Sequence, residues 1–202
     1  GVDQPRHPLS REEARSALGV SVNSPLLLFV ANDYARKGLG TILQAMATPG
    51  LDAHLVVVGS NKQMPVFLER VKALGLFDRV HFVGSLHDVT VAYQAADVLV
   101  HPTLEDSYAM VVPEAMANGL PVIVSAYPWC GVASELTHGV QAMLLQDPQD
   151  VTALAQTIQK ILQSDDVRAD LVRAGSAFAR LHDWRAASLK YERIYENTRV
   201  HS

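Results

Sequence analysis

Two adjacent cations stand before an expected helix in the first part of the chain. Arg36 and Lys37 precede Gly38, and all three follow an apolar run over residues 26–31. The free N–H groups and the dipole at the start of a helix attract phosphate, and cationic side chains add charge-assisted hydrogen bonds. These residue types would suit an anion site. The alternative is an ordinary solvated basic turn, and the spacing of the residues, taken alone, favours that alternative.

Carboxylates gather in and after a second loop. Glu105 and Asp106 follow an expected strand over residues 97–100, and Glu114 falls in the first turns of the next expected helix. A carboxylate can accept hydrogen bonds from two neighbouring hydroxyls, as ribose or hexose recognition requires. The alternatives are compensation of the helix dipole by Glu114 and a local turn formed by Asp106. These residues alone do not decide between sugar recognition and the two structural roles.

Other reactive residue types carry weaker signals. Gly59 ends an apolar run and would let a ligand approach the backbone, but such glycines are also common in turns. Cys130 has no activating neighbour in the sequence, so we expect a buried or loop thiol. Among the histidines, His54 and His81 fall in strands, and we expect His101 to serve packing more than ligand contact. No spacing resembles a zinc site, so no metal is expected.

The hydrophobic pattern predicts strands that alternate with helices. The strands are expected over residues 26–31, 54–58, 80–83, 97–100, 121–124 and 142–145, and the helices between them over 39–47, 64–74, 89–96 and 110–118. Short connections and unbroken apolar strands indicate right-handed βαβ units. The sequence thus predicts an α/β fold: a Rossmann-like open parallel sheet of about six strands with helices on both faces. Ligands of such sheets bind at the carboxyl ends of the strands.

The 202 residues are expected to form a single domain in three parts. Residues 1–24 would be a linker and a short helix, started by a capping box at Ser10 and Glu13. Residues 25–147 would be the βαβ core. Residues 148–202 would be a tail of helices, over 151–163, 166–181 and 184–197.

Composition limits the possible partners and location. The net charge is −4, without a basic face, which argues against nucleic-acid binding. No apolar run is long enough to span a bilayer, and no signal peptide is recognised. A single cysteine fits a reducing compartment, so a cytoplasmic location is expected. The chain does not begin with Met, and we expect it to be an internal part of a longer protein.

Several stretches together resemble one enzyme family. They are residues 28–30 (LFV) with 36–38 (RKG), 80–84 (VHFVG), 95–102 (AADVLVHP) and 113–122 (PEAMANGLPV). On these residues the chain resembles the C-terminal, donor-binding domain of the retaining GT-B glycosyltransferases of family GT4. The form NDYARKG of residues 32–38 is most similar to bacterial lipopolysaccharide core glucosyltransferases.

The resemblance implies roles for individual residues. The family's paired glutamates, separated by seven residues, fall on Asp106 and Glu114. Glu114 would bind the nucleotide ribose, and Asp106, one methylene shorter than the usual glutamate, would orient the donor sugar, with Glu105 as a substitute. Lys37 would act on the diphosphate. The arginine usual at the start of this loop is replaced by Asn32, and Arg36 would supply the missing charge.

The resemblance also implies the remaining donor contacts. Ser85 and Leu86 fall where the family's backbone recognises the base. The approach to the helix at 110–118 would contact the diphosphate through Ser107, Tyr108, Ala109 and Met110. No metal or other cofactor is expected, because the helix dipole and the cations stabilise the leaving diphosphate. The family's glycine-rich loop is altered here, over residues 126–131.

The function implied is retaining transfer from UDP-glucose, or a similar sugar nucleotide, to a glycan or lipopolysaccharide-type acceptor. The acceptor would be bound by an N-terminal GT-B domain that this chain lacks, so the chain alone is not expected to transfer sugar. Peripheral association with the inner face of the membrane would occur through that domain. Two alternatives stay open: a non-catalytic nucleotide-binding module, and another sugar-nucleotide enzyme on this scaffold. A preceding α/β domain would favour the transferase.

Overall fold

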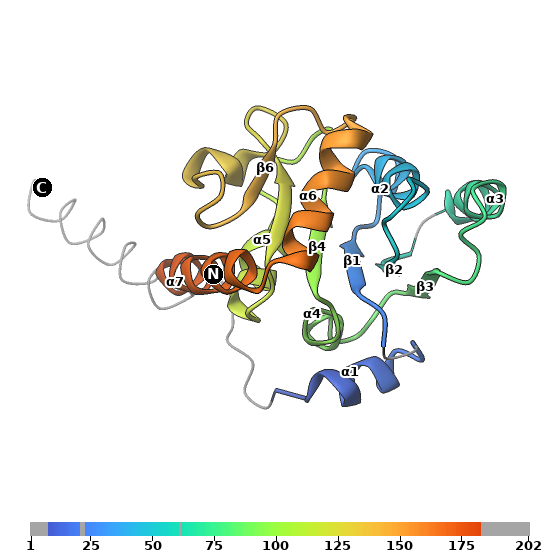
Figure 1. The fold of residues 1–202 in the computed structure, drawn as a ribbon, viewed down its shortest axis with the longest axis horizontal. Helices are drawn as coiled ribbons and strands as arrows, with labels where there is room; N and C mark the ends of the chain where they lie inside the picture. The colour runs from blue at the N-terminus through green and yellow to red at the C-terminus, as the bar shows by residue number, and fades with distance from the viewer. Residues whose placement is uncertain (1–7, 21–22, 61, 183–202) are drawn as a thin grey trace, which may run out of the picture.

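The computed structural model describes residues 8–20, 23–60 and 62–182. Six parallel strands form one sheet in the order β3-β2-β1-β4-β5-β6 (Figure 1). The strands are β1 (Leu26–Val30), β2 (His54–Val58), β3 (Val80–Gly84), β4 (Val98–His101), β5 (Val122–Ser125) and β6 (Met143–Leu145). This is the order of a dinucleotide-binding Rossmann sheet, so the predicted fold class is confirmed.

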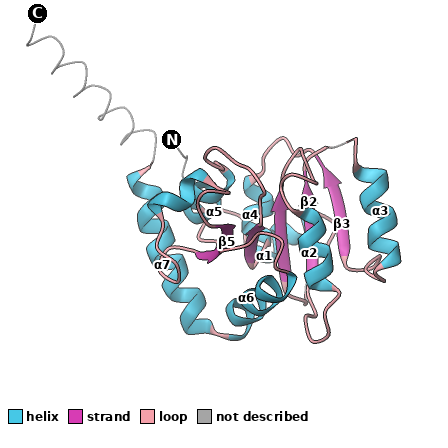
Figure 2. Cartoon of the chain, turned by 90° about the horizontal axis from the view of Figure 1, so that it is seen from above, coloured by secondary structure: helices cyan, strands magenta, loops and turns pink. Residues whose placement is uncertain are grey.

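Helices cover both faces of this sheet, as Figure 2 shows for α2 and α6 on one side and α4 and α5 on the other. The helices are α1 (Arg11–Ala17), α2 (Leu39–Met46), α3 (Met64–Ala73), α4 (Thr90–Ala95), α5 (Val111–Ala117), α6 (Val151–Gln163) and α7 (Asp165–Leu181), with a 3-10 turn, η1, over Gly131–Glu135. The central strands are buried from both sides, which explains why their sequences show no alternation.

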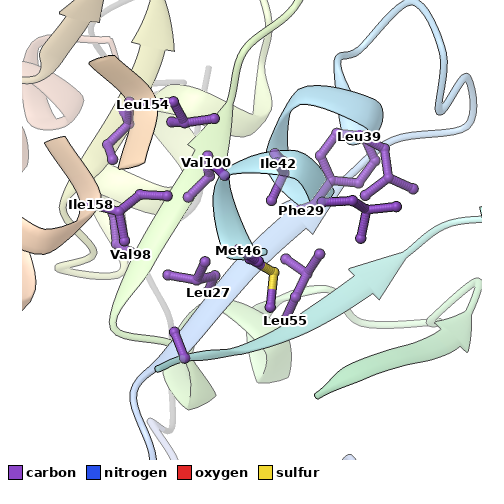
Figure 3. Close-up of a cluster of buried hydrophobic side chains, with 14 of the residues drawn as sticks. Leu27, Phe29, Leu39, Ile42, Met46, Leu55, Val98, Val100, Leu154 and Ile158 are labelled. Carbon is purple, nitrogen blue, oxygen red and sulfur yellow. The ribbon is translucent and has the colours of Figure 1, made fainter. Parts of the chain in front are cut away.

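Alternate residues of each strand point into two separate cores. Leu27 and Phe29 of β1 face the cluster under α2 and α6, whereas Leu26 and Leu28 face the opposite cluster. In Figure 3, side chains of α2 and α6 meet those of β1 and β4 across the first core. The residues drawn there include Ile42, Met46, Val98, Val100, Leu154 and Ile158. Burial on both faces fixes the strand register, because a shift of one residue would exchange the two sets.

The first helix is held against the strand ends opposite the expected ligand edge. Its capping box is formed as predicted: Glu13 N–H donates to Ser10 Oγ at 3.3 Å, and Ser10 N–H donates to the Glu13 carboxylate at 2.8 Å. Asp97, expected in a strand, instead precedes β4. Its carboxylate accepts from buried Arg15 (2.8 Å), from Arg11 (2.6 Å) and from Leu26 N–H (2.8 Å), and these bonds join α1 to β1.

Smaller boundary differences have local causes. The fifth strand begins at Val122, one residue after Pro121, because proline has no N–H to donate to a strand ladder. The last described helix begins at Asp165, one residue earlier than predicted, since Ser164 caps it by accepting from Val167 N–H at 3.3 Å. The helix predicted over 184–197 lies outside the described residues. Over the part of the chain that the structure describes, no helix has the length and apolar character needed to span a membrane.

Candidate functional site

The candidate site lies at the carboxyl ends of the strands, where strand order reverses between β1 and β4. At this topological switch point the loops that follow neighbouring strands diverge and leave room for a ligand. The loops after β1, β2, β3 and β4 carry most of the site residues predicted from sequence. They are connected to one another by side-chain and backbone hydrogen bonds.

A pocket of about 250 Å³ opens between the ends of β1, β2 and β3 and the helix α5. Four predicted site residues line it: Asn32, Gly59, Ser85 and Leu86. The rest of its wall is apolar and consists of Val30, Ala31, Val58, Val89 and Val111. An apolar slot with a few polar groups at its rim suits a flat heteroaromatic ring.

Gly59 is required by packing between the strand ends. Its φ is 116°, and a Cβ at this position would lie 2.1 Å from the carbonyl oxygen of Ala31. Its own carbonyl accepts from the hydroxyl of the fully buried Tyr34 at 2.7 Å. Asn32 Oδ1 accepts from Ser60 N–H at 3.3 Å. The glycine therefore shapes the pocket floor by bringing two backbones together.

Lys37 and Asp106 form the centre of the charged part of the site. Lys37 Nζ donates to Asp106 Oδ2 and to the Glu105 carbonyl, both at 2.7 Å. His101, 1% exposed at the end of β4, brings its Nε2 within 3.2 Å of the same Asp106 oxygen. Toward the described part of the chain Lys37 uses two of its three N–H bonds, and 17% of its side chain is exposed. It therefore retains one donor for an incoming anion.

The second oxygen of Asp106 holds the loop that leads into α5. Oδ1 accepts from Ala109 N–H at 2.7 Å and from Tyr108 N–H at 3.2 Å. Ala109 has φ 58°, an unusual value for a residue with a side chain. The local turn that the residues alone left open is thus present. Both carboxylate oxygens are already engaged within the chain.

These contacts also affect the protonation of Asp106 and His101. Burial on its own would raise the pKa of Asp106, but the hydrogen bonds from His101 and Lys37, the Lys37 charge and the Ala109 N–H hold that pKa below its usual range. Burial lowers the pKa of His101, against the opposing effect of Asp106. At neutral pH the site therefore contains a charged Asp106 beside a neutral His101, which donates through Nε2. Its Nδ1 is buried and has no hydrogen-bond partner among the residues that the structure describes.

Arg36 occupies a different environment from Lys37. Its guanidinium, 53% exposed, pairs with Asp33 at 3.3 Å, and the Asp33 carboxylate also accepts from Arg36 N–H. The carbonyl of Arg36 accepts from Leu104 N–H at 2.8 Å. Gly38 is forced by the same contact between loops, since a Cβ there would lie 2.0 Å from the Pro102 carbonyl oxygen. The Arg36 side chain is thus largely solvated, as expected for an ordinary basic turn.

Glu114 lies on α5 and is bound by a residue that the sequence analysis did not single out. Tyr93, 3% exposed on α4, donates its hydroxyl to Glu114 Oε2 at 2.8 Å. Burial, followed by the charge and hydrogen bond of Glu114, raises the pKa of Tyr93 far above its usual range, so this hydroxyl remains a donor. Glu114 itself is partly exposed.

The altered loop after β5 packs directly on the Asp106 loop. Asp106 N–H donates to the Trp129 carbonyl and Gly131 N–H donates to the Asp106 carbonyl, both at 2.9 Å. A Cβ on Gly131 would lie 1.8 Å from the carbonyl oxygen of Ser107. Met110, Tyr127 and Trp129 present exposed side chains at this edge. Cys130 is fully buried, and burial raises the pKa of its thiol to about 11, consistent with the inert thiol expected.

The remaining histidines of interest lie away from the site. His54 Nδ1 and His81 Nε2 are 3.0 Å apart on neighbouring strands, with their rings stacked. Within residues 8–20, 23–60 and 62–182, no three His, Cys, Asp or Glu side chains are grouped so that they could hold a metal ion.

The sheet order defines the chain as a Rossmann-like α/β domain, with a candidate ligand pocket and a buried charge pair at its switch point. The chain matches the family Glycosyl transferases group 1 over residues 10–178, and it belongs to that family.

Individual relatives agree with this assignment. The lipopolysaccharide glucosyltransferase WaaG of Escherichia coli strain K12 is 32% identical over 165 residues, which cover 80% of this chain and 43% of that protein. A crystal structure of WaaG superposes with a TM-score of 0.77 at 29% identity, over 87% of this chain and 48% of the other. Sucrose-phosphate synthase from Thermosynechococcus elongatus gives 0.82 at 31% identity, over 97% and 50%. The chain thus spans about half the length of these relatives.

Sequence reasoning missed Tyr93 and the pocket residues Val89 and Val111. Val89 and Val111 look like ordinary core residues, and no local pattern marks a tyrosine whose partner is 21 positions away. His101 was assigned to packing, and its burial agrees, but its contact with Asp106 also makes it part of the charged centre. Its position at the end of a buried strand was the available signal.

Proposed function

We propose that this chain is the donor-binding domain of a retaining hexosyltransferase that uses UDP-glucose or a closely related sugar nucleotide. The observation that carries the proposal is the apolar pocket at the switch point, lined in part by the loop that carries Lys37, through Asn32, and by the helix α5 that carries Glu114, through Val111. Kinship with WaaG of Escherichia coli, named a lipopolysaccharide glucosyltransferase, supports a glucosyl donor and a lipopolysaccharide-type or other glycan acceptor.

In this proposal the nucleotide lies along the strand ends. The base enters the pocket against Val89 and Val111, with the backbone at Ser85 and Leu86 at its polar edge. The ribose hydroxyls reach Glu114. The diphosphate meets the remaining N–H of Lys37. Cleavage of the bond from the sugar anomeric carbon to the diphosphate oxygen leaves negative charge on that oxygen, which a fixed ammonium group stabilises.

The sugar end of the site departs from the family pattern. The role of Asp106 in orienting the donor sugar stays a prediction. Its four hydrogen bonds favour an indirect contribution, in which the carboxylate fixes Lys37 and the loop over Ser107, Tyr108, Ala109 and Met110. Glu105 is exposed next to it, and we propose that its carboxylate meets the sugar hydroxyls.

Transfer would need an acceptor-binding partner domain, since the matched relatives are about twice as long as this chain. We propose retention of the anomeric configuration and a cytoplasmic enzyme at the inner face of a membrane, the side from which sugar nucleotides are supplied. The family membership supports the transfer, and the buried, unpaired Cys130 fits a reducing compartment.

Calorimetric titration of this chain tests the proposal. The ligands are UDP, GDP and ADP, together with the glucose, mannose and N-acetylglucosamine derivatives of these nucleotides. We expect UDP to bind, UDP-glucose to bind at least as tightly, and GDP and ADP to bind more weakly. A folded chain that binds none of these ligands would overturn the assignment, and preference for GDP or ADP would overturn the choice of nucleotide.

A further inference from the structure

The contact between Tyr93 and Glu114 joins two helices that follow different strands. Tyr93 is almost fully buried on α4, whereas Glu114 on α5 remains partly open to solvent. The Tyr93 hydroxyl lies 2.8 Å from Glu114 Oε2. Of the two carboxylate oxygens, Oε2 therefore has a fixed donor, and Oε1 has no partner among the described residues.

The position of this pair relates it to the pocket. Val89 comes four residues before Tyr93, and Val111 three residues before Glu114, so each valine shares a helical face with its polar partner. Both valines line the pocket. The Tyr93–Glu114 pair therefore lies one helical turn beyond the apolar wall. A ligand whose ring fills the pocket would carry its next polar group toward Glu114.

We infer that Tyr93 is a positioning residue, which orients the Glu114 carboxylate for the vicinal hydroxyls of the nucleotide ribose. The inference rests on the proposed function, because it assumes that a nucleoside diphosphate fills the pocket. A carboxylate on a flexible side chain samples several orientations. One fixed oxygen limits that sampling and leaves the other oxygen aimed at the ligand, so that less side-chain entropy is lost on binding.

The test compares UDP with 2′,3′-dideoxy-UDP, which lacks both hydroxyls but keeps the base and the diphosphate. Affinities are measured by calorimetry for the wild-type chain and for Tyr93→Phe, which removes only the hydroxyl. We expect the variant to bind UDP about three- to tenfold more weakly. This loss in affinity is a fraction of the contribution of a hydrogen bond to a charged group. Its affinity for the dideoxy nucleotide should match that of the wild type.

Tyr34→Phe is the matched control. It removes an equally buried tyrosine hydroxyl, whose acceptor is the Gly59 carbonyl on the pocket floor. Any change in its affinity should be the same for UDP and for the dideoxy nucleotide. Equal losses for both nucleotides in Tyr93→Phe, or no loss for either, would reject the positioning role while leaving the proposed function intact. Absence of UDP binding to the wild type would reject both.

Removal of the hydroxyl leaves a partly buried carboxylate without its donor, which can affect folding. Comparison of Glu114→Ala with Tyr93→Phe/Glu114→Ala avoids that difficulty, since neither variant keeps a side-chain acceptor for the Tyr93 hydroxyl at position 114. If Tyr93 acts through Glu114, the two variants bind UDP equally within about twofold. A further loss in the double variant would mean that Tyr93 supports the pocket by itself and would overturn the inference.

Discussion

Lys37 and Asp106 lie 69 positions apart in the sequence, and their charged groups meet at 2.7 Å. The contact joins the loop after β1 to the loop after β4, the two strands between which the order of the sheet reverses. It also places the ammonium group beside the Glu105 carbonyl. The cation thus has a defined position before any ligand arrives, which electrostatic stabilisation of a leaving group requires.

Replacement of the two adjacent cations should have unequal effects on nucleotide binding. Lys37→Ala removes the enclosed ammonium and should weaken UDP binding by about 1–3 kcal/mol. Arg36→Ala removes an exposed group that pairs with Asp33, and it should cost less than about 1 kcal/mol. Calorimetry on both variants provides the comparison. Equal losses would show that Arg36 carries the diphosphate charge after all.

Asp106→Asn should change how stability depends on pH. The native pKa of Asp106 is depressed, so its ionic contribution is present above the unfolded-state value of about 3.9 and is lost as pH falls through the native pKa. We expect the variant to be about 1–3 kcal/mol less stable at pH 7, and the difference to shrink below about pH 4. Urea unfolding at pH 7 and pH 3 measures it. A difference that stays constant would contradict the depressed pKa.

Gly59→Ala should destabilise the domain by at least about 2 kcal/mol, because a methyl group would meet the Ala31 carbonyl at a strained φ. Gly139→Ala is the control: its φ is 75°, but the added Cβ meets nothing within 4 Å. Only the backbone term of about 1 kcal/mol applies there. Urea unfolding of both variants separates the free-energy cost of the steric clash from that of the backbone strain. Similar losses would mean that the strand ends move apart easily.

Asp97→Ala should be more damaging than loss of a surface carboxylate. It removes the carboxylate that pairs with the buried Arg15 guanidinium and accepts from Leu26 N–H, at an expected cost of about 3–5 kcal/mol. Asp170→Ala removes an exposed pair with Arg173 and should cost less than about 1 kcal/mol. Thermal or urea unfolding measures both. A small effect for Asp97 would indicate that water reaches Arg15.

The fold follows closely from local sequence signals, because the strands are short apolar runs ended by turn residues. His54–Val58 and Val151–Gln163 have the predicted limits. The differences arise where a distant partner decides. The sequence pattern places Asp97 in a strand. In the structure Asp97 precedes the strand, and its carboxylate accepts hydrogen bonds from Arg15 and Leu26.

The candidate site was accessible to sequence reasoning only in part. Lys37, Asp106, Glu114 and the pocket residue Gly59 stand at strand ends or helix starts, where local patterns mark them. Whether a charged group is enclosed or solvated depends on loops far away in the sequence, and this decides the difference between Arg36 and Lys37. The saturation of Asp106 and the support from Tyr93 are likewise properties of packing.

The division between an apolar wall and interlocked loops has a consequence for engineering the proposed donor preference. Two glycines of these loops leave no space for added atoms, since a Cβ on Gly38 would meet Pro102 and a Cβ on Gly131 would meet Ser107. We expect a library that varies these two glycines to yield mostly misfolded chains. Val111 stands on α5, Val89 stands at the N-cap of α4, and both line the pocket, so exchange of their side chains can reshape the slot proposed for the base while the scaffold is retained.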